Sequence, residues 1–102
     1  MQKLVVLYPP QPDPAKFKSY YVDVHMPLVR KIPGLQALRY SFDVASPAGD
    51  SPYFCVFEGE FADAAAFGAG MGSPEGQAAA GDVPNFAVNA PTMITYPTEA
   101  KM

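Results

Sequence analysis

The apolar residues change their spacing partway along the chain, and this change limits the folds available to it. Between residues 14 and 32 they recur at intervals of three and four, as on one face of an α-helix: Phe17, Tyr21, Val24, Leu28 and Ile32. From residue 38 they alternate, as on one face of a strand: Leu38, Tyr40, Phe42 and Val44. A helix followed directly by a strand indicates a mixed α and β domain.

The first helix has clear boundary signals. Asp13 followed by Pro14 is typical of a helix start, because the carboxylate caps free backbone donors and proline tolerates the first helical position. Gly34 supplies the stop. Pro27 interrupts the pattern and removes one backbone donor, so we expect a local break next to His25, with Pro27 opening a last short turn.

The remaining segments complete a strand, helix, strand, strand, helix, strand order. We predict strands over residues 3–8, 38–44, 53–61 and 92–96, and helices over 14–34, 63–71 and from 74 to about 81. This order is the ferredoxin-like split βαβ arrangement, an α+β fold whose helices cover one face of an antiparallel sheet. We expect one domain over residues 1–102, with 97–102 as a C-terminal tail.

The predicted sheet has a second face that needs a cover. The strands at 3–8 and at the start of 53–61 carry apolar side chains on both faces. Helices account for only one of these faces. A second copy of the chain is the simplest cover for the other, so the sequence predicts a homodimer.

Composition excludes several classes of partner. The net charge of −3, with no basic run, argues against nucleic acid and against an anionic membrane surface. No apolar stretch approaches the ~20 residues of a membrane helix, and the first apolar run ends at Pro9, too early for a signal peptide. Cys55 is the only cysteine, which rules out an intrachain disulfide and points to a reducing compartment. We therefore predict a cytoplasmic protein.

His25, the only histidine, is the main candidate for chemistry. Tyr21 lies one helical turn before it, and Tyr20 lies on the other margin of the apolar stripe. Imidazole transfers protons near neutral pH, and a neighbouring phenol can stabilise an enolate by hydrogen bonding. Asp23 projects from the opposite side of the helix and is a poor orienting partner. The alternative is structural: His25 donates to the carbonyl that Pro27 frees, and the tyrosines are packing groups.

Metal and nucleotide sites find little support. One histidine and one cysteine do not make a conventional zinc site, and Cys55 in an apolar strand is expected to be an inert buried thiol. The glycines between Gly68 and Gly72 lack the preceding strand and the Lys-Ser/Thr ending of a phosphate-binding loop. We predict no cofactor and no metal.

Three motifs together resemble the EthD family of dimeric α+β barrel proteins. They are Lys3-Leu4-Val5-Val6-Leu7-Tyr8, the segment Tyr20-Tyr21-Val22-Asp23-Val24-His25-Met26-Pro27-Leu28-Val29, and Ile32-Pro33-Gly34-Leu35. The resemblance covers essentially the whole chain. It implies a homodimer whose two sheets form a barrel, a ligand cavity between sheet and first helix, and a link to ethyl tert-butyl ether degradation. Relatives in the wider superfamily include cofactor-free oxygenases, polyketide cyclases, isomerases and haem-degrading enzymes, so the fold does not select a reaction.

Three functions remain open from the sequence. The first is a cofactor-independent oxidoreductase or an isomerase or cyclase acting on an apolar, oxygen-bearing metabolite. In it His25 is the general acid or base, Tyr21 acts with it, and Tyr20, Tyr8 and Leu28 contact the substrate. The second is a non-catalytic accessory or carrier protein, including a haem-binding version with His25 as axial ligand. The third is an interaction module whose interior is filled by aromatic side chains.

Overall fold

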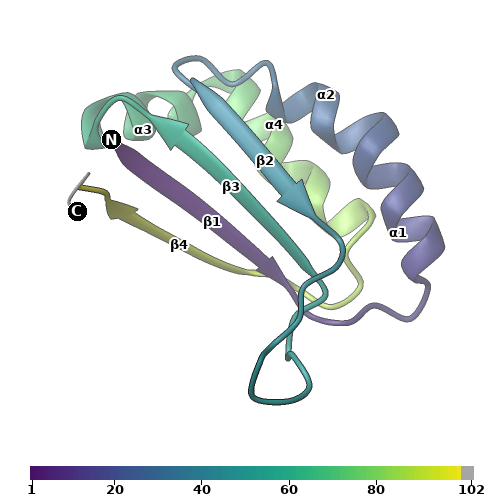
Figure 1. The fold of residues 1–102 in the computed structure, drawn as a ribbon. Helices are drawn as coiled ribbons and strands as arrows, with labels where there is room; N and C mark the ends of the chain where they lie inside the picture. The colour runs from purple at the N-terminus through teal and green to yellow at the C-terminus, as the bar shows by residue number, and fades with distance from the viewer. Residues whose placement is uncertain (100–102) are drawn as a thin grey trace.

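The computed structural model describes residues 1–99, and these form one sheet with helices on one side (Figure 1). The elements are β1 (Gln2–Tyr8), α1 (Pro14–Tyr20), a π-helical turn (Tyr21–His25), α2 (Met26–Val29), β2 (Ala37–Ser41), β3 (Cys55–Phe61), α3 (Ala64–Gly72), α4 (Pro74–Asp82), a 3₁₀ turn (Val83–Asn85) and β4 (Thr92–Pro97). The predicted α+β, ferredoxin-like element order is confirmed.

The four strands lie in the order β2-β3-β1-β4, and each neighbouring pair is antiparallel. The register pairs Val6 with Phe57 on one side and with Met93 on the other, so these three side chains share the face that carries the helices. Val5 and Ile94 pair on the opposite face, which no described helix covers (Figure 1).

The first helix has its local break where Pro27 predicts, and the break takes the form of a π-helical turn. The Met26 N–H bonds to the Tyr21 carbonyl five residues back, which makes Tyr21–His25 a π-helical turn, and Pro27 then lies in the first turn of α2. The Asp13 carboxylate accepts from the Lys16 N–H at 3.1 Å, as expected of a helix cap. Gly34 ends the segment with a φ of +84°, a conformation that glycine adopts without strain.

The second helical region is two helices joined at Ser73. This residue ends α3, and its hydroxyl accepts from the Gly76 N–H at 3.0 Å to cap α4, as its position before Pro74 predicts. Elsewhere the strand ends differ by a few residues. Strand β2 stops at Ser41, short of the predicted residue 44. Strand β4 includes Pro97, which the sequence placed in the tail, and the tail's residues 100–102 lie outside the described part.

Buried aromatic rings form the core between the sheet and α1. The Phe17 ring packs edge-on against Tyr8 at 5.2 Å and stacks on Tyr21 at 5.5 Å between ring centroids. Phe86, from the segment after α4, closes the cluster against Phe17 at 5.2 Å. Aromatic pairs of this kind contribute about 0.5–1.5 kcal/mol beyond the area they bury. This cluster fixes α1 and the π turn on the sheet, and so fixes the direction of His25.

Candidate functional site

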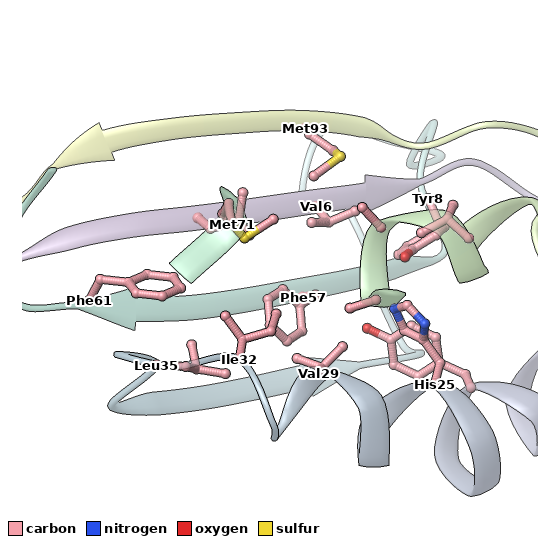
Figure 2. A pocket seen from close by; sticks show the side chains of 15 residues that line it. Val6, Tyr8, His25, Val29, Ile32, Leu35, Phe57, Phe61, Met71 and Met93 are labelled. Carbon is pink, nitrogen blue, oxygen red and sulfur yellow. The ribbon is translucent and has the colours of Figure 1, made fainter. Parts of the chain in front are cut away.

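An apolar cavity of about 50 Å³ lies between the sheet and the helices, and we call it the inner cavity. Figure 2 shows its lining, with Tyr8 and His25 at one end and Leu35 and Phe61 at the other. It is lined by Leu4, Val6, Tyr8, Tyr21, His25, Val29, Ile32, Leu35, Phe57, Phe61, Met71, Ala79, Ala80, Val83 and Met93. Among these described lining residues, only Tyr8, Tyr21 and His25 bring polar nitrogen or oxygen atoms to the cavity, and their rings lie close together.

His25 is paired with Asp82, the last residue of α4. The imidazole Nδ1 lies 3.0 Å from Asp82 Oδ2, and both side chains are buried. Because an ionised carboxylate can only accept, this contact requires the proton to sit on Nδ1. The Nε2 atom is then left as a free base, and no described residue forms a hydrogen bond with it. A histidine held in one tautomer by a carboxylate is arranged for proton transfer.

Two further donors hold the other oxygen of Asp82. The Tyr20 hydroxyl donates to Oδ1 at 2.6 Å, and the Asn85 side-chain amide donates to it at 3.1 Å. Burial works to raise the pKa of Asp82, but the hydrogen bonds from Tyr20, Asn85 and His25 outweigh it, and this pKa is lowered. Asp82 therefore remains a carboxylate at neutral pH and can stabilise a positive charge on His25.

Burial lowers the pKa of His25 below its usual value of 6.5, although the hydrogen bond to Asp82 opposes this shift. The imidazole is therefore neutral at neutral pH. A neutral imidazole with an unoccupied Nε2 is the form that accepts a proton.

The Tyr21 hydroxyl is fully buried and has no hydrogen-bond partner among the described residues. The Tyr21 and His25 rings lie 5.4 Å apart between centroids, and both residues line the inner cavity. Burial, and the nearby Tyr8, raise the pKa of Tyr21, so this phenol keeps its proton. A buried donor with no acceptor costs about 1–3 kcal/mol, which a ligand oxygen would recover.

The structure separates the residues that the sequence grouped as a site. His25, Tyr21 and Tyr8 meet at the inner cavity. Tyr20 does not line it and instead holds Asp82. Leu28 faces a separate surface hollow, with Lys31 and Ala78 among its neighbours there.

The role of Asp82 was missed from the sequence, which names only Asp23 as a nearby carboxylate. Asp23 is exposed, as expected. His25 also does not use the carbonyl near Pro27 in the way the structural alternative supposed, because its Nδ1 is taken by Asp82. One signal was available: an acidic residue at a helix C-terminus opposes the helix dipole, so its presence calls for a specific partner.

Cys55 is fully buried, and burial raises the pKa of its thiol to about 12. It is therefore the inert thiol that the sequence predicts. No helix among residues 1–99 is long and apolar enough to cross a membrane. In the same part of the chain, no cluster of three or more acidic, histidine or cysteine side chains is arranged to hold a metal ion.

The fold and the site together define a small α+β domain with a buried His-Asp pair at an apolar cavity, and comparison with known proteins gives its family. Residues 9–90 match the EthD domain family. An uncharacterized 11.0 kDa protein from the thcB–thcC intergenic region of Rhodococcus erythropolis is 33% identical over 96 residues, which cover 92% of this chain and 91% of that protein. The chain belongs to the EthD family.

Solved structures agree with this assignment. An ethyl tert-butyl ether D (EthD) family protein from Bacillus halodurans matches with a TM-score of 0.90 and 32% identity, over 97% of this chain and 99% of that one. Two other structures share the fold alone. A dimeric ferredoxin-like protein of unknown function from Jannaschia has a TM-score of 0.68 and 21% identity, over 95% and 97% of the chains. A mutant of SnoaB, a cofactor-independent oxygenase from Streptomyces nogalater, has a TM-score of 0.67 and 15% identity, over 99% of this chain and 95% of that one.

Proposed function

We propose that this EthD-family protein is a small cofactor-independent enzyme that transfers a proton on an apolar, oxygen-bearing metabolite. The observation that carries the proposal is the 3.0 Å contact of Asp82 Oδ2 with Nδ1 of His25, which lines the predominantly apolar inner cavity. At neutral pH the pair is a neutral imidazole hydrogen-bonded to a carboxylate, and burying that charge costs desolvation energy. Its position at the cavity supports a role in chemistry.

In the proposed reaction, His25 Nε2 removes a proton from a carbon next to a carbonyl. The electron pair of the broken C–H bond moves onto the carbonyl oxygen, which becomes an enolate. The Tyr21 hydroxyl, buried and unpaired, donates a hydrogen bond to that oxygen. The Asp82 carboxylate stabilises the imidazolium that forms.

Two redox-neutral outcomes follow from the same enolate. Return of the proton to a different carbon gives an isomerase, and attack of the enolate on a second carbonyl carbon gives a cyclase. Oxygenation requires dioxygen as a co-reactant that accepts electrons from the enolate. The fold-level likeness to SnoaB, a cofactor-independent oxygenase, supports including this third outcome.

The size of the inner cavity limits the ligand. Its volume of about 50 Å³ is well below the roughly 300 Å³ at the lower end of small-molecule pockets. A ring compound fits only if the walls move, and the flexible side chains of Met71 and Met93 are the lining residues most able to do so. A haem group does not fit this volume, so the proposal includes no haem.

The test is hydrogen–deuterium exchange at the α-carbons of cyclohexanone and 1-tetralone in D₂O, followed by NMR. The wild-type protein should accelerate exchange above the buffer rate. His25→Gln should lose about 10²- to 10⁴-fold of this acceleration, the usual contribution of a general base. Asp23→Asn, a change at an exposed carboxylate on the same helical segment, is the control and should exchange like wild type. Equal rates for wild type and His25→Gln would exclude His25 as the base.

The second candidate is a carrier for an apolar metabolite, supported by the predominantly apolar lining of the inner cavity. A carrier should bind the ketones, or ethyl tert-butyl ether, without accelerating exchange. Ethyl tert-butyl ether has no proton next to a carbonyl, so its binding is measured by calorimetry alone. Binding without exchange for every ketone would favour the carrier over the enzyme.

We further propose that the protein is a homodimer that pairs through the uncovered face of the sheet. Ile94 and Tyr96 on β4 are 46% and 40% exposed on this face. Lys3 contacts Glu58 there at 3.3 Å, so charged residues border the apolar strip. A second copy would cover these side chains. The unpaired Cys55 is compatible with a reducing compartment, which supports a cytoplasmic location as part of the proposal.

A further inference from the structure

A second hollow, of about 210 Å³, lies beside the inner cavity, and we call it the outer hollow. It is lined by Gln11, Pro12, Asp13, Lys16, Phe17, Tyr20, Pro84, Asn85, Phe86 and Val88. No residue among 1–99 lines both spaces. The two spaces are nevertheless lined by neighbouring residues of the chain. Tyr20 lines the outer hollow and the next residue, Tyr21, lines the inner cavity, and Pro84 and Val83 are related in the same way.

The ring of Phe86 lines the outer hollow and packs against the wall of the inner cavity. Its centroid is 4.6 Å from that of His25 and 5.7 Å from that of Tyr21, two residues of the inner cavity. It also stacks on Tyr20 at 5.5 Å and meets Phe17 at 5.2 Å, two residues of the outer hollow. One aromatic side chain therefore contacts the walls of both spaces at the end of the inner cavity where the polar groups lie.

The backbone around Phe86 is held in place. The Phe86 N–H bonds to the Val83 carbonyl at 3.2 Å, which closes the 3₁₀ turn. Three residues later, the Asn89 N–H donates to Gln11 Oε1 at 3.1 Å, and the Gln11 amide donates to the Asn89 carbonyl at 2.9 Å. The ring is thus fixed from both sides of the chain. Phe86 therefore lies in a segment whose backbone is held by hydrogen bonds on both sides.

We propose that Phe86 is a specificity-determining residue that sets the length of the ligand beside His25. With Phe86 in place, its ring packs against His25 and Tyr21 and separates the inner cavity from the outer hollow, so that a ligand beside His25 is limited to a single small ring system. With a smaller residue, the two spaces join, and the aromatic faces of Phe17 and Tyr20 offer a site for a second ring. This inference rests on the proposed function, because it assumes that the inner cavity binds the ligand.

The experiment compares two ketones that differ by one ring, cyclohexanone and 4-phenylcyclohexanone. Dissociation constants are measured by calorimetry for wild type, Phe86→Leu and Phe86→Ala. The leucine variant retains an apolar side chain and keeps the comparison possible if the alanine variant does not fold. Phe54→Leu is the matched control, because Phe54 packs on Phe17 at 5.0 Å but lines neither space.

We expect wild type and Phe54→Leu to favour cyclohexanone, and Phe86→Leu to shift the ratio of the two constants at least tenfold toward 4-phenylcyclohexanone. Because the readout is a ratio, a uniform loss of affinity does not mimic the effect. An unchanged ratio in a folded Phe86 variant that binds cyclohexanone overturns the inference and leaves the proposed function standing. If wild type binds neither ketone, both the inference and the proposed function are overturned.

Discussion

Asp82 Oδ2 lies 3.0 Å from His25 Nδ1 although the two residues are 57 positions apart in the chain. One comes from a π-helical turn and the other from the last position of α4. The carboxylate fixes which nitrogen carries the proton, and its own second oxygen is occupied by Tyr20 and Asn85. This relationship gives a buried base with a defined free nitrogen, and it leads to the predictions below.

Asp82→Asn should slow α-proton exchange about 10²-fold or more at neutral pH. The amide can still meet Nδ1, but it carries no charge to stabilise the imidazolium. The measurement is the NMR exchange rate with cyclohexanone, at saturating and at low ketone, because a positioning role predicts a fall in kcat with little change in KM. Asp63→Asn, at the cap of α3 and outside the cavity lining, is the control. A rise in KM alone, with kcat kept, would argue against this role for Asp82.

Tyr21→Phe should raise stability and lower activity. Removing a buried hydroxyl that has no described partner should stabilise the fold by about 1–3 kcal/mol. For a domain of this size each kcal/mol is worth about 4–8 °C in Tm. Exchange should fall by about 10²-fold, the usual loss for an oxyanion donor. Tyr53→Phe, which does not line the inner cavity, should change neither Tm nor rate by much. A lower Tm would show that the hydroxyl is structurally satisfied.

The free energy of unfolding should fall as the pH drops below about 6.5, the ordinary pKa of histidine. Because burial lowers the pKa of His25 in the folded state, the unfolded chain binds the proton first, and protonation therefore favours unfolding. The contribution of neutral His25 to the free energy of unfolding is fully present above the pKa of His25 in the unfolded chain. It is lost as the pH falls through the lower pKa of His25 in the folded protein. The lowered pKa of Asp82 acts in the same direction at more acidic pH.

Urea melts from pH 8 to pH 5 measure this effect. The slope of the free energy of unfolding against pH, between pH 6.5 and the pKa of His25 in the folded protein, should be smaller in His25→Gln. That variant has no imidazole to take up the proton. The groups that face the imidazole are Asp82, Tyr21 and Phe86, and none of them ionises in that window to compete. The same slope in both proteins would assign the acid sensitivity to other groups.

Ile94→Glu should convert the proposed dimer to a monomer. The side chain is 46% exposed on the uncovered face of the sheet, and a charge there would be buried without a partner in the dimer. Light scattering coupled to gel filtration gives the mass. Val24→Glu is the matched control, because Val24 is 41% exposed but lies on the helical layer. A wild-type monomer at micromolar concentration would remove the dimer from the proposal.

The order of elements and most of their positions follow from local sequence. Asp13–Pro14 and Gly34 mark the first helical region because caps and glycine conformations depend on a few neighbouring residues. The position of the break near Pro27 is equally local, since a missing N–H acts on the turn in which it occurs. The form of the break, a π turn that directs both Tyr21 and His25 inward, depends on the sheet and rings packed against it.

The sequence by itself determined the family, the ferredoxin-like order of strands and helices, and the choice of His25 as the candidate catalytic residue. It could do so because periodicity, caps and motif spacing are short-range properties of the chain. Only the tertiary structure decided which nitrogen of His25 carries the proton and which one is left as the base. Asp82 reaches it by the packing of α4 on the first helical region, and Phe86 reaches it by the turn that follows. Contacts between segments distant in sequence leave no regular spacing, so the base, its carboxylate and its wall come together only in the fold.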